Sequence, residues 1–99
     1  MSEAIILEFD GVGSDKYQEV NVALGIDPDT GEGDWPDGLL MHTGASSARG
    51  LVVLELWDSK DAQAAFMASR LGPALGGAGL PEPSRAEWLA VEGHFARQR

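Results

Sequence analysis

The 99-residue sequence contains no cysteine. Disulfides, thiolate zinc sites, iron–sulfur clusters and a cysteine nucleophile are therefore excluded. Basic residues are also scarce, because seven Lys and Arg stand against sixteen Asp and Glu, for a formal net charge of −9. A surface of that sign repels phosphate backbones and anionic lipid headgroups. We therefore expect neither a nucleic-acid partner nor a membrane partner, and the charge is expected to serve solubility.

Long apolar runs are missing as well. None approaches the roughly 20 residues that a helix needs to span a bilayer. The first residues, MSEAIILEF, lack the basic start and long apolar core of a signal peptide. The sequence therefore predicts a cytoplasmic protein.

Residues that hold cofactors are few. The chain has two histidines, and no three ligand-type side chains are closely spaced, so we predict no metal site. Gly11 and Gly13 begin a dinucleotide-type glycine pattern, but Lys16 occupies the position of its third glycine. We therefore expect no bound cofactor.

The remaining composition is typical of a folded domain. Apolar residues make up 43% of the chain and charged residues 23%, which argues against disorder. A chain of this length predicts one domain over residues 1–99. It is also near the lower size limit for an independent core, so association with a second copy would help to bury apolar surface.

The hydrophobic pattern predicts strands separated by turns rich in Gly, Pro, Asp and Ser. The expected strands cover residues 3–9, 39–45, 51–57 and 85–92. In the second of them, strict alternation places Leu39, Met41 and Thr43 on one face and His42 on the other.

Two helices are expected between these strands. The first is predicted to be capped by Asp15 and to end at Gly25. The second is predicted to be capped by Asp58 or Ser59 and to be interrupted at Gly72-Pro73. The resulting order, β-α-β-β-α-β, predicts an α+β, ferredoxin-like fold with one four-stranded antiparallel sheet and two helices on one face.

The strand over residues 51–57 is mainly apolar on both faces. Two helices can cover only one face of the sheet in so short a chain, so the second face needs another cover. A second copy of the subunit is the partner that we expect there, through the open sheet face.

His42 is the candidate catalytic residue, because it is the only side chain expected to titrate near neutral pH from within the fold. With Glu55 on the neighbouring strand it could form an orienting pair that leaves its second ring nitrogen free as a general base. The alternative is a histidine with satisfied hydrogen bonds and no catalytic role. Whether the two side chains share a face depends on the register of the hairpin.

Other candidates for a ligand pocket lie in the first helix and the loop after it. Tyr17 and Asn21 fall on the packed stripe of that helix, where Asn21 either bonds to nearby backbone or contacts a ligand. Trp35 lies in the acidic loop over residues 26–38. Its ring either closes the edge of the core or covers a pocket.

The second helix contributes two further candidates. Phe66 is the one aromatic residue on a face of small residues, which leaves room for a cavity. Arg70 either binds an anionic ligand or pairs with an acid such as Glu55 or Glu8.

The stretch ELWDSKDAQAAFMASRLGPAL resembles a segment of the dimeric α+β barrel proteins, the antibiotic biosynthesis monooxygenase-like superfamily. The shared features are a strand that ends in Glu-x-Trp, a capped helix with an aromatic residue, and an Arg-Leu pair followed by proline. In this chain they are Glu55, Trp57, Phe66, Arg70-Leu71 and Pro73. The resemblance implies a homodimer whose two sheets meet face to face in a dimeric α/β barrel.

Members of this superfamily oxidise aromatic polyketides without a cofactor, degrade haem or catalyse isomerisation. The haem-degrading branch has a first-strand asparagine and a later histidine, whereas here the strand AIILEF has no asparagine and Gly76 occupies the histidine position. The resemblance therefore implies no haem. The cofactor-free monooxygenases have Trp, Arg, Asn and Tyr groups around the pocket, and this chain supplies Trp35, Arg70, Asn21 and Tyr17.

Two functions are consistent with these features. One is a monooxygenase-like enzyme without a cofactor that turns over a small apolar or aromatic molecule between the sheet and the helices, with His42 as the acid or base. The other is a non-catalytic homodimer that binds a small hydrophobic ligand or a protein partner. The sequence leaves both open.

Overall fold

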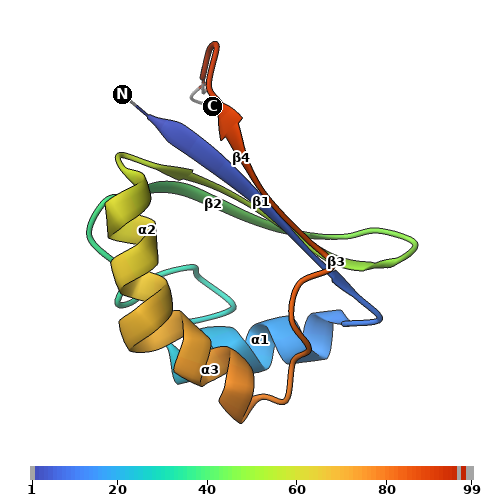
Figure 1. The fold of residues 1–99 in the computed structure, drawn as a ribbon. Coiled ribbons are helices and arrows are strands. Elements are labelled where there is room, and N and C mark those ends of the chain that lie inside the picture. The colour runs from blue at the N-terminus through green and yellow to red at the C-terminus, as the bar shows by residue number, and fades with distance from the viewer. Residues whose placement is uncertain (1, 96, 98–99) are drawn as a thin grey trace.

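The computed structural model describes residues 2–95 and 97 of the chain. Its elements are β1 Glu3–Asp10, α1 Ser14–Ala23, β2 Leu39–Ser46, β3 Gly50–Trp57, α2 Lys60–Phe66, η1 Met67–Leu71, α3 Gly72–Gly77 and β4 Arg85–Ala90. The segments α2, η1 and α3 follow one another without a break and act as one helix in the topology (Figure 1). The order is therefore β-α-β-β-α-β, as the hydrophobic pattern predicts.

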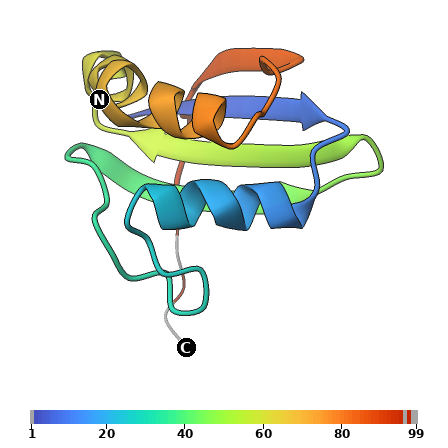
Figure 2. The same cartoon turned by 90° about the horizontal axis from the view of Figure 1, so that it is seen from below.

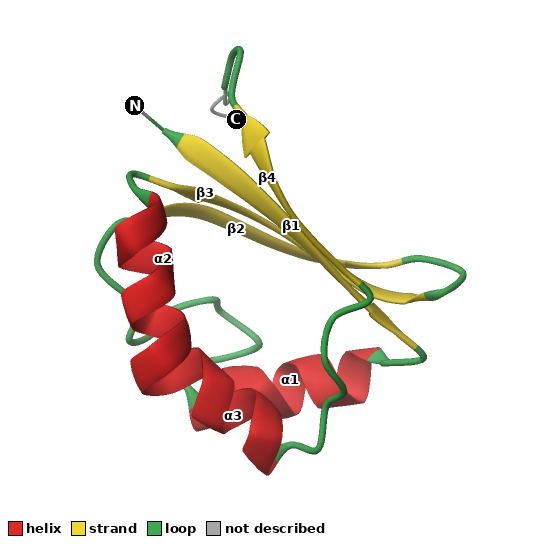
Figure 3. Ribbon diagram, viewed as in Figure 1, coloured by secondary structure: helices red, strands yellow, loops and turns green. Residues whose placement is uncertain are grey.

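The four strands form one antiparallel sheet in the order β2-β3-β1-β4. Both helices lie against the same face of this sheet, and in the described part of the chain no helix covers the other face (Figures 1 and 3). The α+β, ferredoxin-like prediction is thus confirmed. Within the same residues, no helix has the length and apolar character required to cross a membrane.

The core lies between the sheet and the helices. Alternate residues of β1, namely Ile5, Leu7 and Phe9, face the helices and are buried. Leu7 pairs with Val53 of β3, so the two central strands present one continuous apolar surface. Trp57, at the end of β3, is 0% exposed. Because each such side chain contributes about 1.5–3 kcal/mol on burial, this layer holds the helices on the sheet.

An irregularity in β2 changes one of the predicted faces. The pairing of β2 with β3 shifts between Leu39 and Met41, and Leu40 is the extra residue. Leu39 pairs with Trp57 and lies on the same face as His42, so the predicted alternation is wrong at this point. One inserted residue moves every side chain beyond it to the other face of a strand.

The predicted cap of α1 is also wrong. The N-cap residue is Gly13, which makes no side-chain hydrogen bond, and Asp15 lies in the first turn of the helix. A negative charge there still favours the helix through the peptide dipoles. The predicted end is confirmed, since the helix stops at Ala23 and Gly25 has a φ of +80°, the left-handed conformation that commonly follows a helix.

The second helix begins as predicted but is not interrupted at Gly72-Pro73. The Ser59 hydroxyl caps it by accepting a hydrogen bond from the N–H of Ala62. The helix then continues through a π turn over Met67–Leu71 and into α3. Proline would clash within a regular α-helix, and the wider π turn directly before Pro73 changes the backbone geometry there. The result is one long helix whose α3 end lies beside α1 (Figure 2).

Candidate functional site

A cavity of about 50 Å³ lies between the inner face of the sheet and the helices. It is lined by Leu7, Phe9, Tyr17, Val20, Asn21, Leu24, Ile26, Trp35, Leu39, His42, Leu51, Val53, Glu55, Phe66, Leu71, Leu75 and Leu80. This volume holds a few water molecules at about 10–15 Å³ each and is smaller than the roughly 300–1,000 Å³ of most ligand pockets. A ring-sized ligand therefore requires part of the wall to move.

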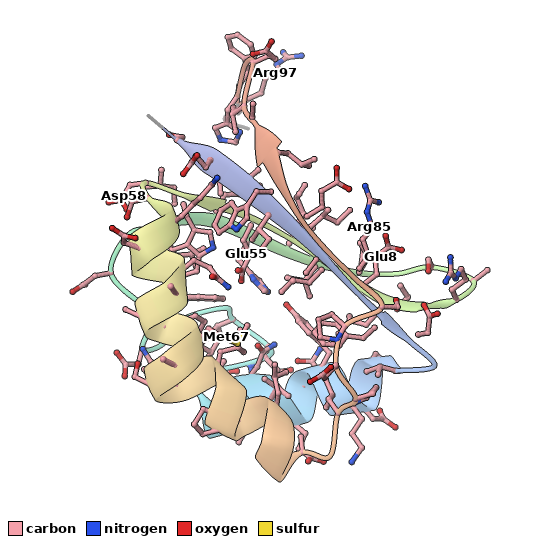
Figure 4. All side chains as sticks on the ribbon, viewed as in Figure 1. Glu8, Glu55, Asp58, Met67, Arg85 and Arg97 are labelled. Carbon is pink, nitrogen blue, oxygen red and sulfur yellow. The ribbon has the colours of Figure 1, made fainter. Side chains whose placement is uncertain are left out.

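Three polar side chains of the cavity, Tyr17, His42 and Glu55, form a continuous chain of hydrogen bonds that ends at Trp57. The hydroxyl oxygen of Tyr17 lies 2.5 Å from Nε2 of His42. Nδ1 of His42 lies 2.7 Å from Oε2 of Glu55. The indole N–H of Trp57 donates to the other carboxylate oxygen, Oε1, over 3.1 Å. Figure 4 shows Glu55 pointing from the sheet into the space between the sheet and the helices.

The chemistry of Glu55 fixes the direction of these bonds. An ionised carboxylate only accepts hydrogen bonds, so the proton between it and His42 lies on Nδ1. In the neutral imidazole, Nε2 is then an acceptor, and the Tyr17 hydroxyl donates to it. The expectation that His42 keeps its second nitrogen free is therefore wrong, because Tyr17 occupies it. In this series of hydrogen bonds, Tyr17 is the terminal group on the helix side of the cavity.

Strand geometry explains how Glu55 meets both of its partners. In the hairpin register His42 pairs directly with Glu55, so the two side chains project from the same face of neighbouring strands. Trp57 follows Glu55 by two residues and shares its face for the same reason. Glu55 is only 4% exposed, and the two donors satisfy the buried carboxylate.

Tyr17 reaches His42 because Gly44 leaves room for its ring. A Cβ atom at Gly44 would lie 2.4 Å from Cζ of Tyr17, far closer than two carbon atoms can approach. The rings of Tyr17 and His42 are parallel to within 1°. The glycine on β2 is therefore required for the contact between α1 and the sheet.

Trp35 forms the loop side of the cavity. Its ring centroid lies 5.3 Å from that of His42, at an interplanar angle of 46°. Its indole N–H donates to the carbonyl oxygen of Gly31 over 2.7 Å, which folds the loop on itself. The ring thus lies against the imidazole and forms part of the cavity wall.

Arg70 does not line the cavity. It donates hydrogen bonds to the carbonyl oxygens of Leu24 and Asp34 over 2.8 and 2.6 Å, and its guanidinium lies 3.4 Å from the Asp34 carboxylate. It also lies over the ring of Phe66, 5.4 Å from the centroid. Arg70 therefore pairs with an acid, as one of the two alternatives predicted, but the acid is Asp34 and not Glu55 or Glu8. Arg70 instead fastens the loop that carries Trp35 to the second helix.

The other predicted pocket residues lie around the cavity. Phe66 packs against Trp57 with ring centroids 5.8 Å apart and contributes to the apolar wall. Asn21 is 7% exposed and lines the cavity from α1. Together with Tyr17, Trp35, His42 and Glu55, these side chains come from both helices, one loop and two strands.

No protein-family model and no curated protein sequence matches the chain, but solved structures do. One is a candidate antibiotic biosynthesis monooxygenase from Chloroflexus aurantiacus J-10-fl, with a TM-score of 0.64 and 14% identity over 96% of this chain and 98% of that one. Another is Rv0793 from Mycobacterium tuberculosis, with a TM-score of 0.63 and 22% identity over 97% of this chain and all (100%) of that one.

A third is a monooxygenase from the gene ActVA-Orf6 of Streptomyces coelicolor, solved in complex with nanaomycin D. Its TM-score is 0.55, with 21% identity over 98% of this chain and 91% of that one. The chain has the antibiotic biosynthesis monooxygenase fold. The resemblance seen in the sequence is thereby confirmed for the fold, while the activity depends on the side chains of this chain.

Within this fold, sequence reasoning missed three residues that build the site. The hydrogen bond from Trp57 to Glu55 could have been found from the two-residue spacing, which places both on one face. Gly44 gave no signal, because a strand glycine has several explanations. No sequence signal indicated Asp34 either, because Asp34 and Arg70 are 36 residues apart in the chain.

Proposed function

We propose that this protein is an enzyme that removes a proton from a neutral, apolar aromatic molecule and promotes its oxidation by O₂ without a bound cofactor. The observation that carries the proposal is the chain of hydrogen bonds from Tyr17 through His42 to Glu55 at the wall of a mainly apolar cavity. An acid–base group in apolar surroundings can hold a substrate proton without competition from bulk water.

In this proposal Tyr17 is the group that touches the substrate. A phenolic O–H of the ligand donates to the Tyr17 oxygen, and as that proton transfers, the Tyr17 proton passes to Nε2 of His42. Glu55 accepts from Nδ1, fixes the orientation of the ring and stabilises the imidazolium that forms, as the carboxylate does in other histidine-centred sites. Tyr17 is thus the catalytic residue, and His42 and Glu55 act through it.

The oxidation itself balances with O₂ as the only co-reactant. A phenolate is electron-rich at the ring carbon opposite its oxygen, where O₂ adds and the imidazolium returns its proton to give a hydroperoxide. Loss of the ring C–H proton and cleavage of the O–O bond then release water and leave a quinone. For 1-naphthol, one O₂ is consumed, and 1,4-naphthoquinone and one water are formed.

Entry of such a ring requires the Trp35 wall to move. Most of the lining comes from strands and helices, whereas Leu24, Ile26 and Trp35 belong to the segment between α1 and β2, and Leu80 to the segment between α3 and β4. The loop between α1 and β2 is held by the Trp35–Gly31 bond and by Arg70. Loops of this kind open more readily than packed strands, so the loop is the proposed entrance.

We also propose that the protein is a homodimer through the open face of its sheet. Ile6 and Leu54 pair across β1 and β3 and point away from the helices, on the face that no described helix covers (Figure 3). Leu54→Glu is expected to shift the native mass from dimer to monomer, because it would bury a charge in the interface. Val22→Lys, on the exposed side of α1, is the control and should stay dimeric. A wild-type monomer at micromolar concentration contradicts the dimer.

One observation favours a second function, a non-catalytic module that binds a small hydrophobic ligand. The Nε2 atom of His42 is already bonded to Tyr17, which is also the arrangement of a purely structural histidine with satisfied hydrogen bonds. The two functions differ in turnover, and a single assay separates them.

The assay is O₂ uptake with 1-naphthol in buffer treated with chelator, with formation of 1,4-naphthoquinone followed by absorbance. The wild-type protein and Gly76→Ala, whose site in α3 is open, are expected to turn over. Tyr17→Phe and His42→Ala are expected to lose about 100-fold or more, the usual contribution of a general base. Turnover that persists in both variants contradicts the roles given to Tyr17 and His42. The absence of turnover in a wild type that binds a ligand favours the binding module.

A further inference from the structure

Asn21 is a buried amide without a hydrogen-bond partner in the described residues. It is 7% exposed and lines the cavity. No polar side-chain atom of those residues is both enclosed and unpaired, so the amide atoms of Asn21 meet open space rather than apolar atoms alone. A buried asparagine normally has its bonds satisfied by protein or water, and here the cavity is the side from which a partner can come.

The other polar groups of the cavity are already engaged. Tyr17, His42 and Glu55 bond to one another or to Trp57, and the Trp35 indole donates to a backbone carbonyl. Of the polar side chains that line the cavity, Asn21 therefore retains the largest capacity for new bonds. An amide has one acceptor oxygen and two N–H donors.

Gln63 is a second buried amide without a side-chain hydrogen bond to the described residues, and it differs from Asn21 in its position. It is 8% exposed, lies on α2 and is not part of the cavity lining. The two amides thus form a natural pair for comparison, one that faces the cavity and one that does not.

Asn21 and Tyr17 are one helical turn apart on α1. Residues at i and i+4 lie on the same face of a helix, with Cβ atoms about 5–6 Å apart. The cavity therefore offers two neighbouring polar groups on one wall, and the remaining lining is mainly apolar.

The charges around the site favour a neutral ligand. The cavity lining contains no Lys or Arg, and Arg70 is engaged by Leu24 and Asp34 outside it. Its one carboxylate, Glu55, would repel an anion, and the net charge of the chain is −9. An anionic group in such a pocket would be desolvated without a counter-charge.

We propose that Asn21 determines the specificity of the pocket by binding a second, neutral oxygen of the ligand, a carbonyl or a hydroxyl, on the same ring system as the hydroxyl held by Tyr17. The ligand class is then a neutral aromatic compound with two oxygen functions. An amide can donate to a carbonyl and accept from a hydroxyl, so it holds that oxygen before and after an oxidation. This inference rests on the proposed function for the hydroxyl at Tyr17, but binding can be measured without turnover.

The test compares affinities within one two-ring skeleton by anaerobic titration calorimetry. The probes are 6- and 7-hydroxy-1-tetralone, 5,6,7,8-tetrahydro-2-naphthol, which lacks the carbonyl, and the corresponding tetrahydronaphthoate, which carries a negative charge. The wild-type protein is expected to bind the better hydroxytetralone about 10-fold more tightly than the tetrahydronaphthol, the ratio that one buried hydrogen bond provides. The carboxylate should bind more weakly than both.

Two variants assign this preference to Asn21. Asn21→Leu should bind both neutral probes with similar affinity, because it removes only the bond to the carbonyl. Asn21→Asp keeps the shape but cannot donate to a carbonyl, so it also should lose the preference, and it covers the case in which the Leu variant does not fold. Gln63→Leu is the matched control and should keep the full ratio.

The outcomes separate this inference from the proposed function. A wild type that binds none of the neutral probes, or that binds them without preference, overturns the inference, as does a preference that survives in Asn21→Leu or Asn21→Asp. A preference that depends on Asn21 in a protein without O₂ uptake supports the inference and contradicts the enzyme. O₂ uptake without the preference contradicts only the inference.

Discussion

The Tyr17 hydroxyl and the His42 Nε2 atom lie 2.5 Å apart, although they come from a helix and from the edge strand of the sheet. The contact joins the two layers of the fold inside the cavity. It also changes the role expected of His42, because the imidazole reaches a ligand through the phenol and not directly.

Gly44→Ala should disrupt the contact without touching either partner. The new Cβ would lie 2.4 Å from Tyr17 Cζ, so the Tyr17 ring must leave its position beside His42. We expect a loss of O₂ uptake comparable to that of Tyr17→Phe, together with destabilisation of about 1–3 kcal/mol from overpacking. Urea unfolding and the naphthol assay measure the two effects.

Gly76→Ala is the control for that substitution. Its Cβ meets nothing within 4 Å, and an alanine within a helix is more stable than glycine by about 0.5–1 kcal/mol. Gly44→Ala with wild-type turnover and wild-type stability would show that Tyr17 does not depend on this glycine.

Glu55→Gln should destabilise the protein by about 1.5–3 kcal/mol, the range for hydrogen bonds to a charged group. The carboxylate accepts from both His42 and Trp57, whereas an amide has one acceptor oxygen and must turn its NH₂ toward one of these donors. Glu87→Gln, in an exposed pair with Arg85, should change stability by less than about 1 kcal/mol. Equal effects of the two substitutions in urea unfolding would contradict the role assigned to Glu55.

Arg70→Met should loosen the loop over residues 26–38 while the sheet stays intact. Two hydrogen bonds to the loop ends are lost, and the methionine keeps the contact with Phe66 through its apolar chain. Amide hydrogen exchange should become faster in this loop and remain slow in β1 and β3. Lys16→Met, in an exposed pair with Glu19, should leave exchange in the loop unchanged. Unchanged loop exchange in Arg70→Met would refute the proposed fastening.

Asp10 makes the stability of the fold depend on pH in the acidic range. Hydrogen bonds from Arg49 and then from Ser84 hold the pKa of Asp10 below its ordinary value of 3.8. Because this pKa is lower in the folded state, the stabilisation is fully present above 3.8 and is lost as the pH falls through the lower folded value. Asp10→Asn should therefore lower the Tm near neutral pH, and the difference from wild type should vanish in strong acid. A difference that is constant with pH would contradict this link.

The parts of the structure that follow from local patterns could be predicted, and those that depend on insertions or distant contacts could not. The alternation over residues 51–57 predicted a strand with two mainly apolar faces, and the Gly25 end of α1 followed from its helix signal. The bulge at Leu40 has no signature in the sequence, yet it decides which face Leu39 occupies.

The second helix illustrates the same limit. Gly72-Pro73 ordinarily ends a helix, and only the π turn before it, over Met67–Leu71, allows the helix to continue. The candidate site shows the same limit of local sequence patterns. The His42–Glu55 pair was one of two alternatives, and the hairpin register decided between them. The Tyr17 contact required a helix to meet β2 at a glycine, which no local pattern encodes.

The most direct test of the central claim is the ¹⁵N NMR spectrum of the His42 ring, compared between the wild type and Tyr17→Phe. If Glu55 and Tyr17 hold the imidazole between them, the wild type at a pH where the ring is neutral will show a protonated Nδ1 and an unprotonated Nε2 that accepts a strong hydrogen bond. In Tyr17→Phe the Nε2 resonance will then shift toward that of a free pyridine-type nitrogen, while Nδ1 stays protonated. A proton on Nε2 in the neutral wild-type ring, or an Nε2 resonance that does not change in Tyr17→Phe, would contradict the account.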